Sequence, residues 1–142
     1  MDIKHVVSSV CRKYNTADPF QIAILSGIKI LYLDLGKTYG FFHIYRRMPM
    51  IVLNQNLPEH LMRFVCSHEL GHRFLHRGVN TPYLKAHTLF SIDKIEREAN
   101  TFAVELLLPD DVLRDNEGIN FYTLAQCAGI SEGLESLKIL QT

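Results

Sequence analysis

The sequence predicts an α+β domain in which a small antiparallel sheet of about three strands packs against helices. Apolar residues recur with helical spacing along residues 3–14, 57–76 and 92–108, whereas β-branched and aromatic residues gather in short runs within residues 28–54. A chain of 142 residues is large enough to bury one core. We therefore expect one domain over residues 1–142, comprising N-terminal helices (1–27), a β-meander (28–54), two long helices (57–108) and a helical tail (109–142).

Two helices are expected before the sheet. Apolar residues from Ile3 to Tyr14 fall on one face of the first helix. Asp18 followed by Pro19 is a typical helix start, with Asp as the N-cap and Pro in the first position. Gly27 is expected to end this second helix in the left-handed conformation.

Three strands are expected in residues 28–54. The β-rich runs cover residues 28–33, 41–45 and 50–53, and turn residues separate them at Gly36, Gly40 and Pro49. The simplest arrangement of three such runs is an antiparallel meander.

Two longer helices follow the expected sheet. The first has Pro58 in its first turn and apolar residues on one face, and the second is expected to end before Pro109. Beyond it, the tail indicates two or three short helices broken at Gly118 and Gly129.

The composition excludes several classes of protein. Fifteen basic residues balance fifteen acidic ones, so no global charge favours nucleic acid or an anionic membrane. The sequence has no apolar run long enough to span a bilayer, and its first residues do not resemble a signal peptide. Three widely spaced cysteines argue against a disulfide framework. We expect a cytoplasmic protein that contacts neither membrane nor nucleic acid directly.

Residues 68–72 form an H-E-x-x-H motif on the first long helix. This spacing places His68 and His72 one turn apart on one face, where both imidazoles can bind a single Zn²⁺, and Glu69 beside them can hold a water without being a ligand. By chance alone the motif would occur in about 2 of 100 shuffled sequences. The alternative is a pair of core histidines, but burying them with Glu69 would leave three polar groups in need of partners.

A catalytic zinc site needs a third protein ligand, and the second long helix offers Glu96 and Glu98. Glu96 lies about 60° and Glu98 about 100° from the centre of the apolar face, so Glu96 is favoured, in a gluzincin-like arrangement, and Glu98 is expected in solvent. Glu96 could instead form a capping box with Asp93. Asn100, one turn after Glu96, is a candidate for orienting a ligand.

The string His68-Glu-Leu-Gly-His-Arg-Phe-Leu-His76, followed by Glu96-Arg-Glu-Ala-Asn-Thr-Phe-Ala-Val-Glu-Leu-Leu-Leu-Pro109, resembles the ImmA/IrrE family of metallopeptidases. The resemblance implies a zincin-like helix pair with one zinc ion per chain, held by His68, His72 and Glu96, with Glu69 as catalytic base. It also implies an anti-repressor of a phage or mobile element that cleaves a helix-turn-helix repressor, although some relatives regulate stress responses. Leu108 stands where the family often has Met.

Other side chains are weaker candidates for the site. A metzincin ligand six residues after His72 is excluded because that position is Gly78. We expect His76 either to line the pocket or support a metal ligand, or to be a histidine at the end of the helix, where the helix dipole favours it. His43 and His87 are expected to be exposed or in loops, and Tyr83 and Tyr122 are candidates for polarising a carbonyl.

The tail contains a competing signal. Residues 124–131 have a spacing of residue types that is typical of a helix-turn-helix, with Gly129 in the turn. The tail carries six acidic residues against two basic ones, which is the wrong sign for phosphate contacts. We favour a helical hairpin or a surface for a protein partner. The alternatives to a peptidase are a zinc-stabilised module that sequesters a regulator without cutting it and a DNA-binding regulator.

Overall fold

The computed structural model describes residues 1–78, 80–81 and 84–140. The elements follow in the order α1 (Ile3–Tyr14), α2 (Pro19–Leu25), β1 (Lys29–Leu33), β2 (Thr38–Tyr45), β3 (Met48–Asn54), α3 (Glu59–Leu75), β4 (Leu84–Lys85), the 3₁₀ helix η1 (Ala86–Phe90), α4 (Lys94–Leu107), α5 (Asp110–Asp115), α6 (Phe121–Cys127) and the 3₁₀ helix η2 (Leu134–Leu137). These elements confirm the α+β class. In the described ranges, no helix is long and apolar enough to cross a bilayer.

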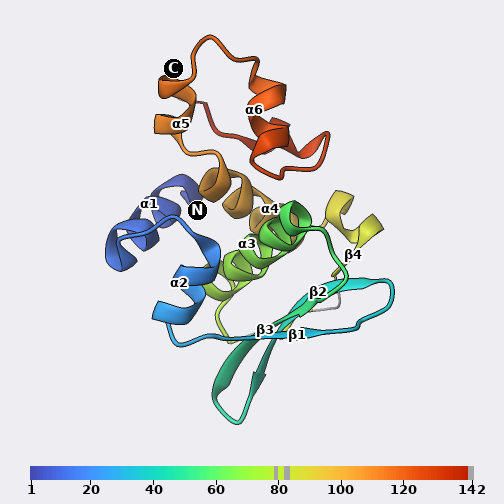
Figure 1. Ribbon diagram of the computed structural model, residues 1–142. Coiled ribbons are helices and arrows are strands. Elements are labelled where there is room, and N and C mark those ends of the chain that lie inside the picture. Colours follow the sequence, from blue (N-terminus) through green and yellow to red (C-terminus); the bar gives the residue numbers. More distant parts are fainter. Residues whose placement is uncertain (79, 82–83, 141–142) are drawn as a thin grey trace.

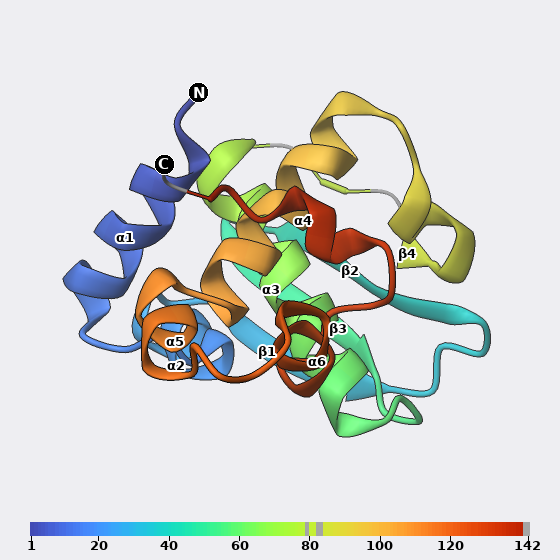
Figure 2. The same ribbon diagram turned by 90° about the horizontal axis from the view of Figure 1, so that it is seen from above.

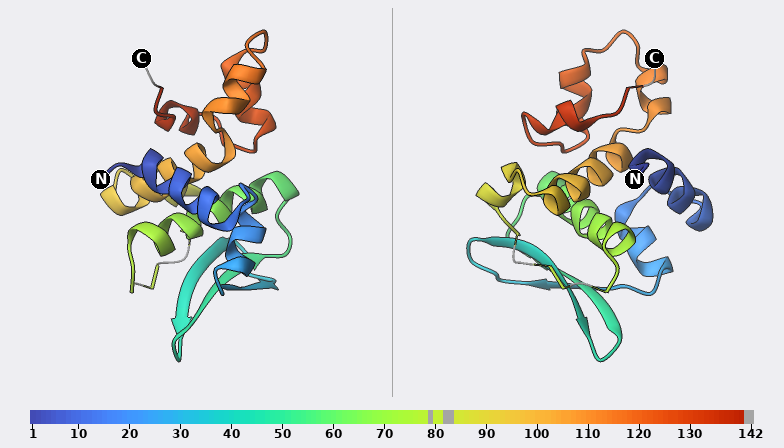
Figure 3. Two further views of the ribbon diagram at one scale, coloured as in Figure 1. Left: turned by 90° about the vertical axis from the view of Figure 1, so that its left-hand side faces the viewer. Right: turned by 180° about the vertical axis from the view of Figure 1, so that it is seen from behind.

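The elements form layers around the pair α3 and α4 (Figures 1 and 3). The sheet lies on one side of this pair, α3 packs against β2 and β3, and the tail covers the opposite side. Helices α1 and α2 lie together at one flank, which the view from above also shows (Figure 2). Consequently α3 is enclosed on several sides, and its middle is fully buried.

The start and end of α2 follow the sequence signals. The Asp18 carboxylate accepts the backbone N–H of Phe20, as an N-cap does. At the other end Gly27 adopts a φ of 82°, and the N–H of Ile28 donates to the carbonyl of Ala23. This is a Schellman ending, so the predicted stop at Gly27 is confirmed.

The sheet departs from the predicted antiparallel meander in two respects. Its strands are ordered β1-β3-β2-β4, and the β2–β3 pair is the expected antiparallel hairpin, closed by Arg46 and Arg47 with φ angles of 50° and 66°. β1, however, pairs with β3 in parallel, and the short strand β4 adds a fourth member beside β2. The sheet is therefore mixed.

Asn54 is hydrogen-bonded to the connection that crosses the end of β3 between β1 and β2. The chain leaves Leu33 and crosses the end of β3 to reach β2, and the Asn54 side chain donates to the carbonyls of Gly36 and Thr38 at 2.9 Å each in this crossing. The N–H of Gln55 donates to the Leu33 carbonyl at 2.8 Å. Crossing one strand requires roughly 10 Å, which an extended chain covers in about three residues.

Both long helices start later than expected. Helix α3 is two residues shorter at its start than expected, and α4 begins at Lys94 rather than near residue 92.

The two long helices approach each other closely at Gly71. A Cβ atom at Gly71 would lie 3.0 Å from Cα and the carbonyl oxygen of Ala99 and from Cβ of Phe102. The backbone of α3 therefore contacts α4 closely, in the turn that carries the H-E-x-x-H motif.

We expect Gly71→Val to destabilise the fold by about 3 kcal/mol, because the added methyl groups would overlap the buried backbone of α4. Gly118→Val is the matched control, since a Cβ at Gly118 meets no atom within 4 Å. Thermal unfolding of both variants by circular dichroism measures the difference. Equal unfolding midpoints would contradict the close packing of the two helices.

The acidic tail is joined to α4 by buried charges. The Lys138 ammonium lies 2.9 Å from Oε1 of Glu105, and the N–H of Ile139 donates to Oε2 of the same carboxylate at 2.7 Å. Ala125, Ile130 and Leu134 from the tail belong to the main core cluster. The predicted short helices are present, and they pack as a helical cover on α4 and the start of α3 rather than projecting away from the domain.

Candidate metal centre

The H-E-x-x-H motif lies in the buried middle of α3. His68 is 0% exposed and His72 is 2% exposed, and their Nε2 atoms are 3.2 Å apart. The two imidazole rings meet edge to face with centroids 4.8 Å apart. The predicted spacing therefore brings both imidazoles together at one point between α3 and α4.

Glu96 reaches this point from the first turn of α4. Its Oε1 lies 2.9 Å from His72 Nε2, and its Oε2 lies 3.3 Å from His68 Nε2. Asp93, the N-cap of α4, makes no side-chain capping bond, so the alternative capping box is not formed. Of the two carboxylates proposed from the sequence, Glu96 is the one that the structure places against both imidazoles.

These three side chains fit a tetrahedral zinc ion. Ligand atoms at about 2.0–2.1 Å from a tetrahedral zinc are about 3.3–3.4 Å apart. The two Nε2 atoms are 3.2 Å apart, close to that value, and each has one oxygen of Glu96 nearby, Oε2 at 3.3 Å from His68 and Oε1 at 2.9 Å from His72. Two imidazoles and a carboxylate are also the donor set of catalytic zinc sites, which keep a fourth position for water.

The charges at this point are tightly coupled. Burial by itself raises the pKa of Glu96, but hydrogen bonds with His68 and His72 hold that pKa well below its usual range. Burial lowers the pKa of His72. Burial also acts to lower the pKa of His68, but the hydrogen bond to Glu96, the negative charges of Glu69 and Glu96 and the hydrogen bond to Asn100 together outweigh it and raise that pKa. The Glu96 carboxylate thus remains ionised, which is the form in which a carboxylate can bind a metal ion.

Glu69 lies beside the imidazoles with an oxygen that has no partner. Its side chain is 0% exposed, and Oε1 accepts a hydrogen bond from the Thr81 hydroxyl at 3.4 Å. Oε2 is the single buried side-chain N or O atom without a hydrogen bond among the described residues. Burial raises the pKa of Glu69 to about 7. A cation between the histidines would lower this pKa, leaving a carboxylate poised to accept a proton.

Asn100 is hydrogen-bonded to the outer nitrogen of His68. Its Oδ1 lies 2.7 Å from His68 Nδ1, while its Nδ2 donates to the Leu89 carbonyl at 2.7 Å. Because Nδ2 is the donating end of the amide, Oδ1 must accept, and His68 Nδ1 must carry the hydrogen. In a neutral His68 this arrangement leaves Nε2 with a lone pair, which binding of a metal ion at that atom requires.

His76 and Glu98 extend the site from His72. His76 Nδ1 lies 3.0 Å from His72 Nδ1, and His76 Nε2 lies 3.1 Å from Glu98 Oε1. The expectation that Glu98 faces solvent is therefore wrong, since its side chain is 18% exposed and paired. The error arose from treating α4 alone, because His76 lies just beyond the end of α3 and turns back toward α4.

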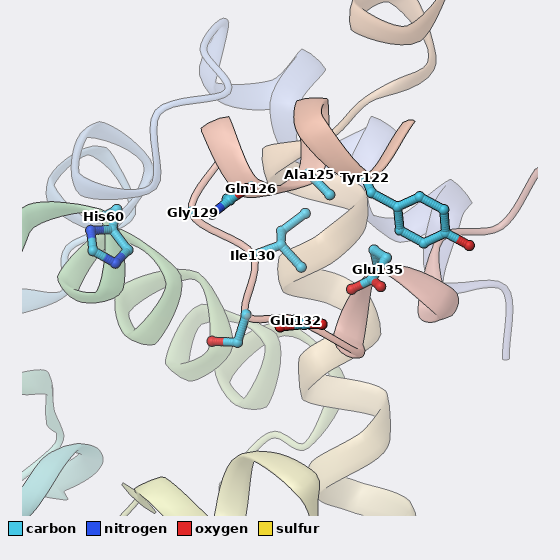
Figure 4. Close-up of a pocket in the computed structure, with 9 residues that line it drawn as sticks. His60, Tyr122, Ala125, Gln126, Gly129, Ile130, Glu132 and Glu135 are labelled. Carbon is cyan, nitrogen blue, oxygen red and sulfur yellow. The ribbon is translucent and has the colours of Figure 1, made fainter. Parts of the chain in front are cut away.

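The remaining candidates lie elsewhere. His43 is half-buried on β2, His87 is exposed on η1, and Tyr83 falls outside the described residues. Tyr122 lines a separate cavity of about 750 Å³ between the tail and the start of α3, whose lining excludes His68, His72 and Glu96 (Figure 4). Sequence reasoning missed Thr81, because a lone threonine in a loop carries no signal of its tertiary partner.

The chain is similar in sequence to one protein family and to two individual proteins. Residues 25–139 match the IrrE N-terminal-like domain of peptidase family M78. "Uncharacterized immunity region protein 2" of Bacillus phage phi105 is 43% identical over 141 residues, covering 97% of this chain and 89% of that protein. Metallopeptidase ImmA of Bacillus subtilis (strain 168) is 36% identical over 115 residues, covering 80% of this chain and 67% of that protein. The matched regions include the site described above.

Proposed function

The chain belongs to the IrrE N-terminal-like family of metallopeptidases, also known as the ImmA/IrrE family, and from this premise we propose that it is a zinc-dependent endopeptidase that cleaves a helix-turn-helix repressor. One observation carries the proposal of catalysis. The two Nε2 atoms and the Glu96 carboxylate converge within 3.3 Å of one another, beside a fully buried carboxylate, Glu69, that has an oxygen without a partner. A binding module would not require that free oxygen.

His68, His72 and Glu96 would hold the zinc ion in this mechanism. When bound, zinc supplies Lewis-acid chemistry that polarises a carbonyl and makes a water molecule acidic near neutral pH. Glu69 Oε2 accepts a proton from the attacking water as the new C–O bond forms at the scissile carbonyl carbon. Glu69 then passes that proton to the leaving nitrogen as the C–N bond breaks. The products are one new carboxylate and one new amine.

The proposed substrate is a repressor of a phage or mobile element. The similarity to an immunity region protein of Bacillus phage phi105 supports a role in phage immunity. The acidic surface of the tail also supports a basic protein partner over DNA, because most of its acidic residues, including Asp111, Asp115, Glu117 and Glu132, are exposed, while Lys138 is buried. A helix-turn-helix protein carries the complementary positive charge that binds phosphates.

We place this activity in the cytoplasm and assign it to residues 1–142 as one unit. Cys11, Cys66 and Cys127 are all free thiols, which suits a reducing compartment. Residues from Ile3 to Leu134 contribute to one hydrophobic cluster, so each segment expected from the sequence shares the same core.

Co-expression with the repressor encoded beside its gene tests the proposed function. We expect discrete repressor fragments and relief of repression, because the proposed enzyme cleaves this one partner at a defined site. The fragments should disappear when zinc is removed by a chelator. An intact repressor together with relieved repression, in both the wild type and Glu69→Gln, would favour the sequestering module and contradict the peptidase.

A further inference from the structure

The structure contains a hydrogen-bonded chain that runs from α4 back to the metal centre through two histidines. Glu98 Oε1 lies 3.1 Å from His76 Nε2, and His76 Nδ1 lies 3.0 Å from His72 Nδ1. The His72 and His76 rings are 5.1 Å apart at an interplanar angle of 50°. Glu98 is 18% exposed and His76 is 12% exposed, so the chain is largely shielded from water.

We infer that Glu98, acting through His76, holds His72 in the tautomer whose Nε2 is free to bind metal. Glu98 and His76 are then positioning residues, which act through His72. This inference rests on the proposed function, because the hydrogen-bond directions given below hold with a metal ion bound at His72 Nε2.

A metal ion bound at His72 Nε2 occupies the lone pair of that atom, so the hydrogen of a neutral His72 is on Nδ1. His72 then donates from Nδ1 to His76 Nδ1, which accepts through its lone pair. A neutral His76 carries its own hydrogen on Nε2 and donates it to Glu98, because an ionised carboxylate only accepts hydrogen bonds. Without the metal ion, His72 Nε2 lies 2.9 Å from Glu96 and can donate to that carboxylate instead. The acceptor at the outer end therefore favours the metal-binding tautomer of His72.

The same logic operates independently on the other imidazole. His68 donates from Nδ1 to Asn100, whose orientation is set by the Leu89 carbonyl. Each histidine of the motif therefore has its outer nitrogen bound to a chain that ends in an acceptor, a carbonyl for His68 and a carboxylate for His72. The carboxylate adds negative charge to the second chain, which increases the basicity of the imidazole toward a cation.

Zinc affinity of three single variants, measured by competition with a chromogenic chelator, tests the inference. Outer partners of metal-bound histidines typically contribute about 10–100-fold to metal affinity. We expect Glu98→Ala to lower zinc affinity by about tenfold, and Glu98→Gln to restore most of it because the amide oxygen still accepts from His76. Glu117→Ala, at an exposed glutamate in the tail, is the matched control and should bind zinc as the wild type does.

A double-mutant cycle separates positioning from general loss of packing. His76→Asn keeps an amide oxygen where Nδ1 of His76 accepts from His72, but it removes the link to Glu98. In the His76→Asn background, Glu98→Ala should cause no further loss of zinc affinity, because the hydrogen bond between residue 76 and Glu98 is already absent. Circular dichroism of each variant checks that the fold is retained.

Two results would overturn the inference. One is wild-type zinc affinity in Glu98→Ala, and the other is an equal loss from Glu98→Ala with His76 and with Asn at position 76. Failure of the proposed function is distinguishable from either result. A wild-type protein that binds zinc but cuts no repressor would contradict the peptidase. The zinc affinities of the variants relative to the wild type would still test the hydrogen bonds that link Glu98 through His76 to His72.

Discussion

Glu69→Gln is expected to slow repressor cleavage by about 10²–10⁴-fold while the protein still binds one zinc ion. The substitution keeps the shape of the side chain and its hydrogen bond with Thr81, but an amide cannot take a proton from water. The large effect follows from the position of Oε2, which is buried beside the imidazoles with no hydrogen-bond partner. The cleavage rate with purified repressor and the zinc content by mass spectrometry are the two measurements.

Glu59→Gln provides the control for this substitution, because Glu59 is exposed at the start of α3, outside the acidic surface of the tail. It should cleave at the wild-type rate. Cleavage by Glu69→Gln at the wild-type rate would show that Glu69 is not the base, whereas loss of zinc from this variant would show that Glu69 serves as a ligand.

Glu96→Ala is expected to weaken zinc binding by roughly a hundredfold or more, which exceeds the loss expected from Glu98→Ala. The reason is that Glu96 contacts the Nε2 atoms of both His68 and His72, while Glu98 acts only through His76. Without Glu96, the zinc ion would be bound by two neutral imidazoles only, and no negatively charged ligand would offset its double positive charge in the buried site.

Zinc titration of the metal-free protein with a competing chelator ranks the two variants at limiting metal. The assignment of Glu96 as the third ligand requires the order wild type, Glu98→Ala, Glu96→Ala from tightest to weakest. Equal affinities in the two variants, or a weaker Glu98→Ala, would contradict it.

Local signals in the sequence were sufficient for the helices and for the metal-binding motif. The cap at Asp18 and the left-handed residue Gly27 depend on neighbours within a few positions, and both occur where expected. The spacing of His68 and His72 on one helix likewise fixes their separation to one turn. Such features can be predicted because their physical causes lie within one segment.

Features that depend on two segments were predicted less well. The parallel placement of β1 requires a connection that crosses the end of β3, and the Asn54 side chain is hydrogen-bonded to two carbonyls of this connection, which lie eighteen and sixteen positions earlier in the chain. The pairing of Glu98 with His76 relies on how α4 crosses the end of α3, so the angle of Glu98 on its own helix was a poor guide to its exposure. Short β-rich runs and helical angles contain no information about such crossings.

Hydrolysis of the purified repressor in water enriched in ¹⁸O tests the central claim most directly. The claim predicts two fragments, with ¹⁸O in the new C-terminal carboxylate of the N-terminal fragment, because the attacking oxygen comes from water. Fragmentation should stop on zinc removal and resume when zinc is restored, and Glu69→Gln should leave the repressor intact over the same period. A repressor that stays whole with the zinc-loaded wild-type protein, yet binds it and releases its DNA, would contradict peptide-bond hydrolysis as the function of this site.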